Sequence, residues 1–195
     1  MAAGKVEIGY SKPYVALYSV SGSTVTYSSG QLLARGVGQS TSIDTSDNND
    51  FYADNIVAES EGGVFNGGTL TLTVDGLLQS SEKLIMGLAA ADTTTGMIAY
   101  GDSQNIPDVG YGAVLMYQSD GVVSYTPIIY PRVRFNQIDN SANTKEENKD
   151  WQTQELTATI KRAEDADRHW KYIGGEALAT ESAAEAKIKT FFGIA

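Results

Sequence analysis

Residues 69–75 read Thr-Leu-Thr-Leu-Thr-Val-Asp, so polar and apolar side chains alternate strictly. Successive side chains of a β-strand point to opposite faces, and Leu70, Leu72 and Val74 would therefore share one face. A helix could not gather these side chains on one side. The segment predicts a β-strand with one face in a core and a hydroxyl-rich face outside it.

Several other segments are rich in β-branched and aromatic residues and are separated by turn sequences. Ser21-Gly22-Ser23 and Asp120-Gly121 are such turns, and an Asp-Gly pair is a strong hairpin signal. Pro127 is expected to end the pairing after the second turn, and Pro131 indicates a sheet edge or a bulge. The expected strands cover residues 14–20, 24–27, 69–75, 111–117, 122–125, 128–130, 133–135 and 151–160.

The hydrophobic period changes after residue 75, and this change predicts a helix over residues 77–87. Asp75 is placed to cap its start and Gly87 to end it. A second helix is expected over residues 181–192. Here Ser182 and Glu185 have the spacing of a capping box, and Gly193 follows the last turn. The apolar stripe of the first helix consists of Leu77, Leu78, Leu84, Ile85 and Leu88, with Ser81 among them.

These elements predict a mainly β fold, with two antiparallel sheets in a β-sandwich and one flanking helix. A chain of 195 residues is long enough for one such domain with an extension. We assign residues 1–175 to the sandwich and residues 176–195 to a C-terminal helical extension.

Residues 46–68 form a polar, glycine-rich excursion that nevertheless contains large apolar side chains. So many large apolar side chains are unusual in a fully solvated loop. We therefore expect a long hairpin or loop that packs on a partner surface. The apolar residues are Phe51, Tyr52, Ile56, Val57 and Phe65.

Composition limits the chemistry that the chain can perform. There are no cysteines, which excludes disulfides, zinc-thiolate sites and cysteine nucleophiles, and His169 is the one histidine. No nucleophile, base and orienting group come together in the sequence. The chain is therefore predicted to have no catalytic residue, cofactor or metal site.

Acidic residues are the one plentiful catalytic type, and the formal net charge is −10. Such a surface repels phosphate and disfavours tight nucleic-acid binding. The run Asp47-Asn48-Asn49 lacks the glycine and glutamate pattern of a calcium-binding EF-hand. A hydrolase would need two carboxylates roughly 5–10 Å apart across its substrate, and this reading stays open as an alternative.

The start of the chain has no apolar run behind it, so no signal peptide is expected. No segment approaches the roughly 20 apolar residues of a membrane span. Synthesis and folding in a cytoplasm are expected.

Five short segments resemble the major tail protein family of siphophages that infect Gram-positive bacteria. They occur in the same order and with similar spacing as in that family, over roughly residues 14–172. The segments are Phe51-Tyr52-Ala53-Asp54-Asn55 with Glu59, Gly68 through Leu77, Tyr130-Pro131-Arg132-Val133-Arg134-Phe135, Thr144-Lys145-Glu146-Glu147 and Trp151-Gln152-Thr153-Gln154.

The resemblance implies a non-enzymatic virion protein, made in the host bacterial cytoplasm and located in the phage tail. Members of the family assemble as hexameric rings that stack into a tube around a tape-measure protein. Tail terminator and baseplate proteins are further implied partners, and double-stranded DNA later passes through the lumen. Contacts between copies are expected at Phe51, Tyr52, Asp54, Ile56, Val57 and Phe65. Lumen-facing positions are expected at Thr69, Thr71, Thr73 and Asp75.

The residues alone also fit a different function. Tyrosines and tryptophans also line carbohydrate-binding sandwiches, so a carbohydrate-binding or adhesin module is the leading alternative.

Overall fold

The computed structural model describes residues 4–102, 104–140, 142, 144 and 152–194 of the chain. The resemblance residues Lys145, Glu146, Glu147 and Trp151 lie outside this part. The elements are β1 (Val6–Ser21), β2 (Thr24–Leu32), β3 (Gly36–Thr45), β4 (Asn49–Ala53), β5 (Ile56–Glu61), β6 (Phe65–Val74), α1 (Gln79–Met86), β7 (Val109–Ser119), β8 (Val122–Phe135), β9 (Gln154–Lys161), β10 (Tyr172–Ile173) and α2 (Glu181–Phe192).

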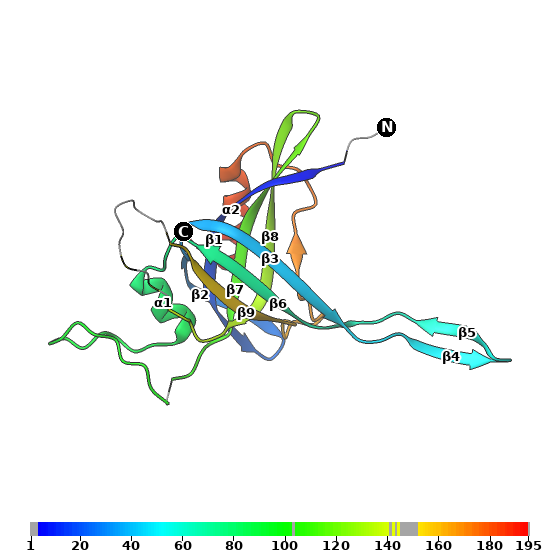
Figure 1. Ribbon diagram of the computed structural model, residues 1–195, viewed down its shortest axis with the longest axis horizontal. Coiled ribbons are helices and arrows are strands. Elements are labelled where there is room, and N and C mark those ends of the chain that lie inside the picture. The colour runs from blue at the N-terminus through cyan, green and yellow to red at the C-terminus, as the bar shows by residue number, and fades with distance from the viewer. Residues whose placement is uncertain (1–3, 103, 141, 143, 145–151, 195) are drawn as a thin grey trace.

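Eight of the strands form one antiparallel sheet (Figure 1). The order is β2-β1-β7-β8-β9-β6-β3, and β10 pairs with β8 outside this path. β4 and β5 form a separate two-stranded sheet. The prediction of a mainly β fold with two helices is confirmed.

The main core lies on the inner face of this sheet. The alternation in residues 69–75 is confirmed, because Leu70, Leu72 and Val74 are fully buried. They share one apolar cluster with residues from β1, β7, β8 and β9, including Tyr111 and Tyr130. Helix α1 adds Ile85 and Met86 to the same cluster. Strands from both halves of the sheet order thus contribute to one core.

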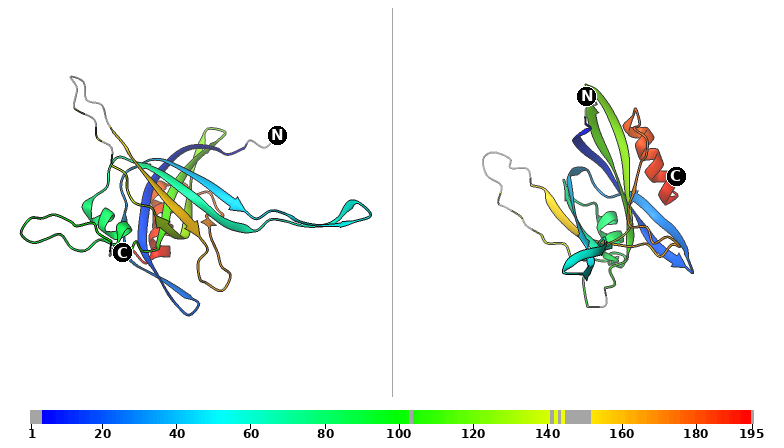
Figure 2. Two further views of the ribbon diagram at one scale, coloured as in Figure 1. Left: turned by 60° about the horizontal axis from the view of Figure 1, so that its bottom comes forward. Right: turned by 90° about the vertical axis from the view of Figure 1, so that its right-hand side faces the viewer.

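A second apolar cluster joins α2 to the other face of the sheet (Figure 2). Ala184, Ile188 and Phe192 on α2 pack against side chains of β1, β7 and β8. Gly110 and Gly112 of β7 allow this close approach. A Cβ atom on Gly112 would lie 2.8 Å from the Cγ2 atom of Ile188.

Both helices end at the expected glycines, since Gly87 and Gly193 adopt left-handed conformations as C-caps. Their starts correct the sequence prediction. Leu78 is the N-cap of α1, with no side-chain cap, because Asp75 pairs with Arg35 instead.

The N-cap of α2 is also different from the predicted one. The hydroxyl of Thr180 accepts a hydrogen bond from the amide N–H of Ala183, so the predicted Ser182–Glu185 box is wrong. Glu185 instead accepts a hydrogen bond from Tyr14 and pairs with Lys12 and Lys189.

The predictions for the two prolines of β8 had different outcomes. The strand does not end at Pro127, which lies opposite Val114 within the continuous β7–β8 ladder. The predicted irregularity at Pro131 is confirmed, since the register of that ladder shifts between the pairs Tyr111–Tyr130 and Val109–Val133. Such a bulge accommodates a residue that has no N–H to donate.

Candidate assembly surface

The β4–β5 hairpin projects well beyond the main sheet (Figures 1 and 2). Ala53 pairs with Ile56, and the two residues between them, Asp54 and Asn55, have φ angles of 52° and 65°. Two positive φ values are typical of the tight turns that match the twist of a hairpin. The excursion over residues 46–68 is therefore an ordered ribbon.

Four of the five predicted contact residues with large apolar side chains lie together on this ribbon. The exposed fractions are 64% for Phe51, 62% for Tyr52, 65% for Ile56 and 47% for Val57. Asp54 is exposed at the turn. A lone two-stranded ribbon is marginally stable in water and gains stability by packing on another surface.

Phe65 has a different environment from the other predicted contact residues. It is partly buried and stacks on Trp170, with the ring centroids 4.6 Å apart. The guanidinium of Arg162 lies 5.7 Å from the centroid of the Phe65 ring, and its Nη2 atom donates to the Phe65 carbonyl oxygen. Phe65 therefore fixes the root of the hairpin to its own chain.

The predicted lumen residues lie on the face of β6 opposite the core. Thr69 is exposed, and Thr71 and Thr73 are partly buried. Paired positions on the neighbouring strands extend this surface, with Ser42 and Thr159 on either side of Thr69. In the next row, Ser40 and Thr157 flank Thr71 in the same way, so the three strands present a hydroxyl-rich face.

Asp75 follows this face at the end of β6. Its carboxylate accepts hydrogen bonds from the backbone N–H and the guanidinium of Arg35. Burial acts to raise the pKa of Asp75, but the hydrogen bonds and charge of Arg35 outweigh it and lower the pKa. Asp75 stays charged and ties β6 to the start of β3.

The carboxylate of Asp108 has three cationic partners, and no motif in the sequence indicated it. Arg132 and Arg134 each donate to it at 2.7 Å, and Lys161 donates at 3.0 Å. Burial acts to raise the pKa of Asp108, but the hydrogen bonds and charges of Arg132 and Lys161 lower it. Three cations converging on one partly buried carboxylate hold the ends of β8 and β9 against the loop before β7.

His169 is held in a local contact within its own segment. Its Nδ1 atom lies 2.7 Å from Oδ2 of Asp165, and the Tyr172 hydroxyl donates to the same oxygen. Among the described residues, no serine or threonine hydroxyl bonds to its other ring nitrogen. The pair orients a ring but lacks the nucleophile that a hydrolytic triad requires.

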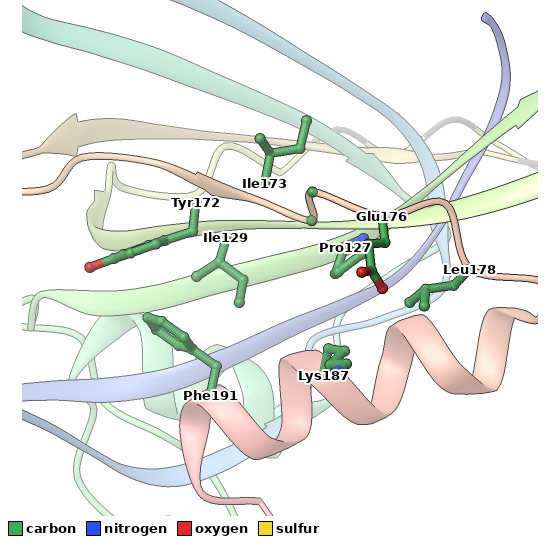
Figure 3. Close-up of a pocket in the computed structure, with 10 residues that line it drawn as sticks. Pro127, Ile129, Tyr172, Ile173, Glu176, Leu178, Lys187 and Phe191 are labelled. Atoms are coloured by element: carbon green, nitrogen blue, oxygen red, sulfur yellow. The ribbon is translucent and has the colours of Figure 1, made fainter.

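An apolar groove separates α2 from the segment around β10 (Figure 3). Its volume is about 480 Å³, and Ile129, Tyr172 and Phe191 lie along it. Glu176 and Lys187 supply opposite charges within its lining. Nothing in this arrangement supplies the convergent polar groups that would orient a specific small ligand.

Within the described residues, no cluster of three or more histidines and carboxylates could hold a metal ion. Neither α1 nor α2 is long and apolar enough to cross a bilayer.

The chain matches no protein-family model. No curated protein matches its sequence.

Proposed function

We propose that this chain is a structural, non-enzymatic subunit of a phage tail tube. Copies would assemble head to tail into hexameric rings, and the rings would stack into a tube whose lumen conducts double-stranded DNA. By resemblance, the tape-measure, tail terminator and baseplate proteins are its partners, and the virion tail is its location. The observation that carries the proposal is the projecting hairpin with four exposed apolar side chains.

The architecture is compatible with a tail-tube subunit. The curved sheet is interpreted as sandwich-like, because β9, β6 and β3 share one core with β1, β7 and β8. Residues 1–175 would form this tube domain, and residues 176–195 its docked helical extension. A heterologous contact, in which the two partners use different surfaces, closes into a ring or continues as an open stack. A tube of stacked rings needs one contact of each kind.

The hydroxyl-rich face of β3 and β6 is proposed to line the lumen. Thr69, Thr71 and Thr73 offer hydrogen bonds but no positive charge to passing phosphates. Because DNA must slide through a conduit, a wall without a continuous cationic surface avoids the tight electrostatic binding that would stop it.

The central test is self-assembly of the purified chain at rising concentration, followed by sedimentation and electron microscopy. The wild type is expected to form rings or tubes. The variant Phe51→Ser/Tyr52→Ser is expected to remain a folded monomer. A matched control, Leu78→Ser/Met97→Ser, removes two side chains that are 62% and 73% exposed on the α1 side. Normal tubes from the hairpin variant, or a wild type that stays monomeric, would contradict the proposal.

The leading alternative is a carbohydrate-binding or adhesin module. The observation in its favour is that Phe51 and Tyr52 place two exposed rings at the end of one hairpin. Glycan-array binding by a stable monomer, lost in the same double variant, would favour this alternative over the tail tube.

A further inference from the structure

A groove with a volume of about 480 Å³ lies at the root of the β4–β5 hairpin. Its lining contains four cationic side chains and no carboxylate, which is unusual in a chain with a net charge of −10. The lining residues are Val64, Phe65, Asn66, Gly67, Arg132, Thr159, Ile160, Lys161, Arg162 and Arg168.

The four cations differ in how far their own chain neutralises them. Arg132 pairs with Asp108 and Glu164, and Lys161 pairs with Asp108. Arg162 contacts the ring and the carbonyl oxygen of Phe65, which carry no net charge. The exposed side chain of Arg168 has no carboxylate partner in the described part of the chain. The groove therefore keeps a net positive charge, because Arg162 and Arg168 are not neutralised by an ion pair.

The hairpin has the opposite charge. No lysine or arginine occurs between Arg35 and Lys83, whereas the β4–β5 ribbon contains Asp50, Asp54, Glu59 and Glu61. All four carboxylates are exposed, and none of them pairs with a cation in the described residues.

The hairpin of one chain cannot reach its own groove while its strands remain paired. Val64 lines the groove, and Asp54 at the turn is ten positions away along the ribbon. An extended strand advances about 3.3 Å per residue, so the turn lies roughly 30 Å from the groove. The projecting ribbon in Figure 1 agrees with this separation.

We propose that the acidic β4–β5 hairpin of one copy docks in the basic groove at the hairpin root of the next copy. This proposal rests on the proposed function and names the contact through which copies stack. Tip and root are different surfaces, so the contact is heterologous and can repeat from one copy to the next. Successive copies would be related chiefly by a shift along the hairpin, which builds an axial array.

Charge reversal tests the contact with two variants. The groove variant carries Arg162→Glu and Arg168→Glu. The hairpin variant carries Asp54→Lys, Glu59→Lys and Glu61→Lys, which changes the charge of the ribbon from −4 to +2. Each variant alone sets like charges against each other and is expected to associate about tenfold or more weakly than the wild type. Mixed together, each hairpin meets a groove of opposite charge, so the mixture is expected to form an alternating array. Sedimentation and electron microscopy of each sample measure this.

Folding of the variants is checked by thermal unfolding. Because Arg162 also contacts Phe65, a second groove variant carries Arg168→Glu alone, whose exposed side chain contributes little to the monomer. Weaker association of this single variant, rescued by the hairpin variant, supports the docking.

Two results would overturn this contact while leaving the tail-tube assignment in place. One is wild-type tubes accompanied by normal assembly of either charge variant alone. The other is tight binding of duplex DNA that is lost in the groove variant, because the groove would then bind phosphate. A wild type that stays monomeric at every concentration would overturn both proposals.

Discussion

The indole of Trp170 lies flat on the ring of Phe65, with the two planes 5° from parallel. This stack joins the first residue of β6 to the segment between β9 and β10. It holds the hairpin root in one direction relative to the sheet. The hairpin can therefore project as a defined ribbon although its outer part contacts nothing within the described chain.

Removing this stack should destabilise the monomer. Phe65→Ala is expected to lower the free energy of unfolding by about 2 kcal/mol, because it removes partly buried apolar area and a stacked aromatic pair. Phe51→Ala is the matched control, since Phe51 is exposed and its loss should change stability by less than about 0.5 kcal/mol. Chemical denaturation measures both values. Equal effects of the two substitutions would show that the stack does not stabilise the hairpin root.

Asp108 should make stability depend on acid pH. Its pKa in the folded protein lies below the ordinary 3.8. The resulting stabilisation is fully present above pH 3.8 and is lost as the pH falls through the lower, folded-state pKa.

Asp108→Asn should reduce stability at pH 7 by about 2–3 kcal/mol, because three cations lose their shared partner. The difference from the wild type should shrink below pH 3.8. Denaturation series from pH 7 to pH 2 measure this, and a difference that is constant with pH would contradict the assignment.

The glycines of β7 should control how α2 docks. Gly112→Ala places a Cβ atom 2.8 Å from Ile188 and 3.0 Å from Phe192, so α2 must shift. The expected loss is about 1–3 kcal/mol, with faster proteolysis of the C-terminal segment. Gly101→Ala is the control, because its Cβ atom would meet nothing within 4 Å. Equal stability and cleavage of the two variants would show that α2 tolerates the added methyl group.

The proposed lumen face can be tested by thiol labelling, because the chain has no cysteine of its own. Thr69→Cys should react with both small and bulky maleimides in the monomer. In assembled tubes the bulky reagent should be excluded from the bore, while the small one still reacts. Rapid labelling of intact tubes by the bulky reagent would place Thr69 on the outside.

The local features of the fold could be predicted from the sequence. The alternation through Leu70, Leu72 and Val74 and the glycines after each helix depend on neighbouring residues, and all of these predictions are confirmed. The start of α1 was misplaced because Asp75 bonds to Arg35, which is 40 positions away. Long-range partners of this kind leave no periodic signal in a single sequence.

The residues of the candidate site also fall into those that could be predicted from local sequence and those that could not. Phe51, Tyr52, Ile56 and Val57 stood out because large apolar residues are unexpected in an acidic, glycine-rich segment. Phe65 belonged to the same pattern, and its contacts with the distant Trp170 and Arg162 distinguish it. The basic groove combines residues from four separate segments, and the Asp108 cluster combines residues from three, so no local motif could have indicated them.

The pairing of β1 with β7 also affects how the chain folds. About a hundred residues separate the partners, since Tyr10 lies opposite Leu115 and Val15 opposite Tyr111. During synthesis β1 therefore cannot pair with β7 until the middle of the chain has left the ribosome. Until then the apolar face of β1 is exposed. Sheets dominated by such distant pairings fold over roughly milliseconds to seconds. Stopped-flow refolding should show this slow closure, and half-made chains should depend on chaperones to avoid aggregation.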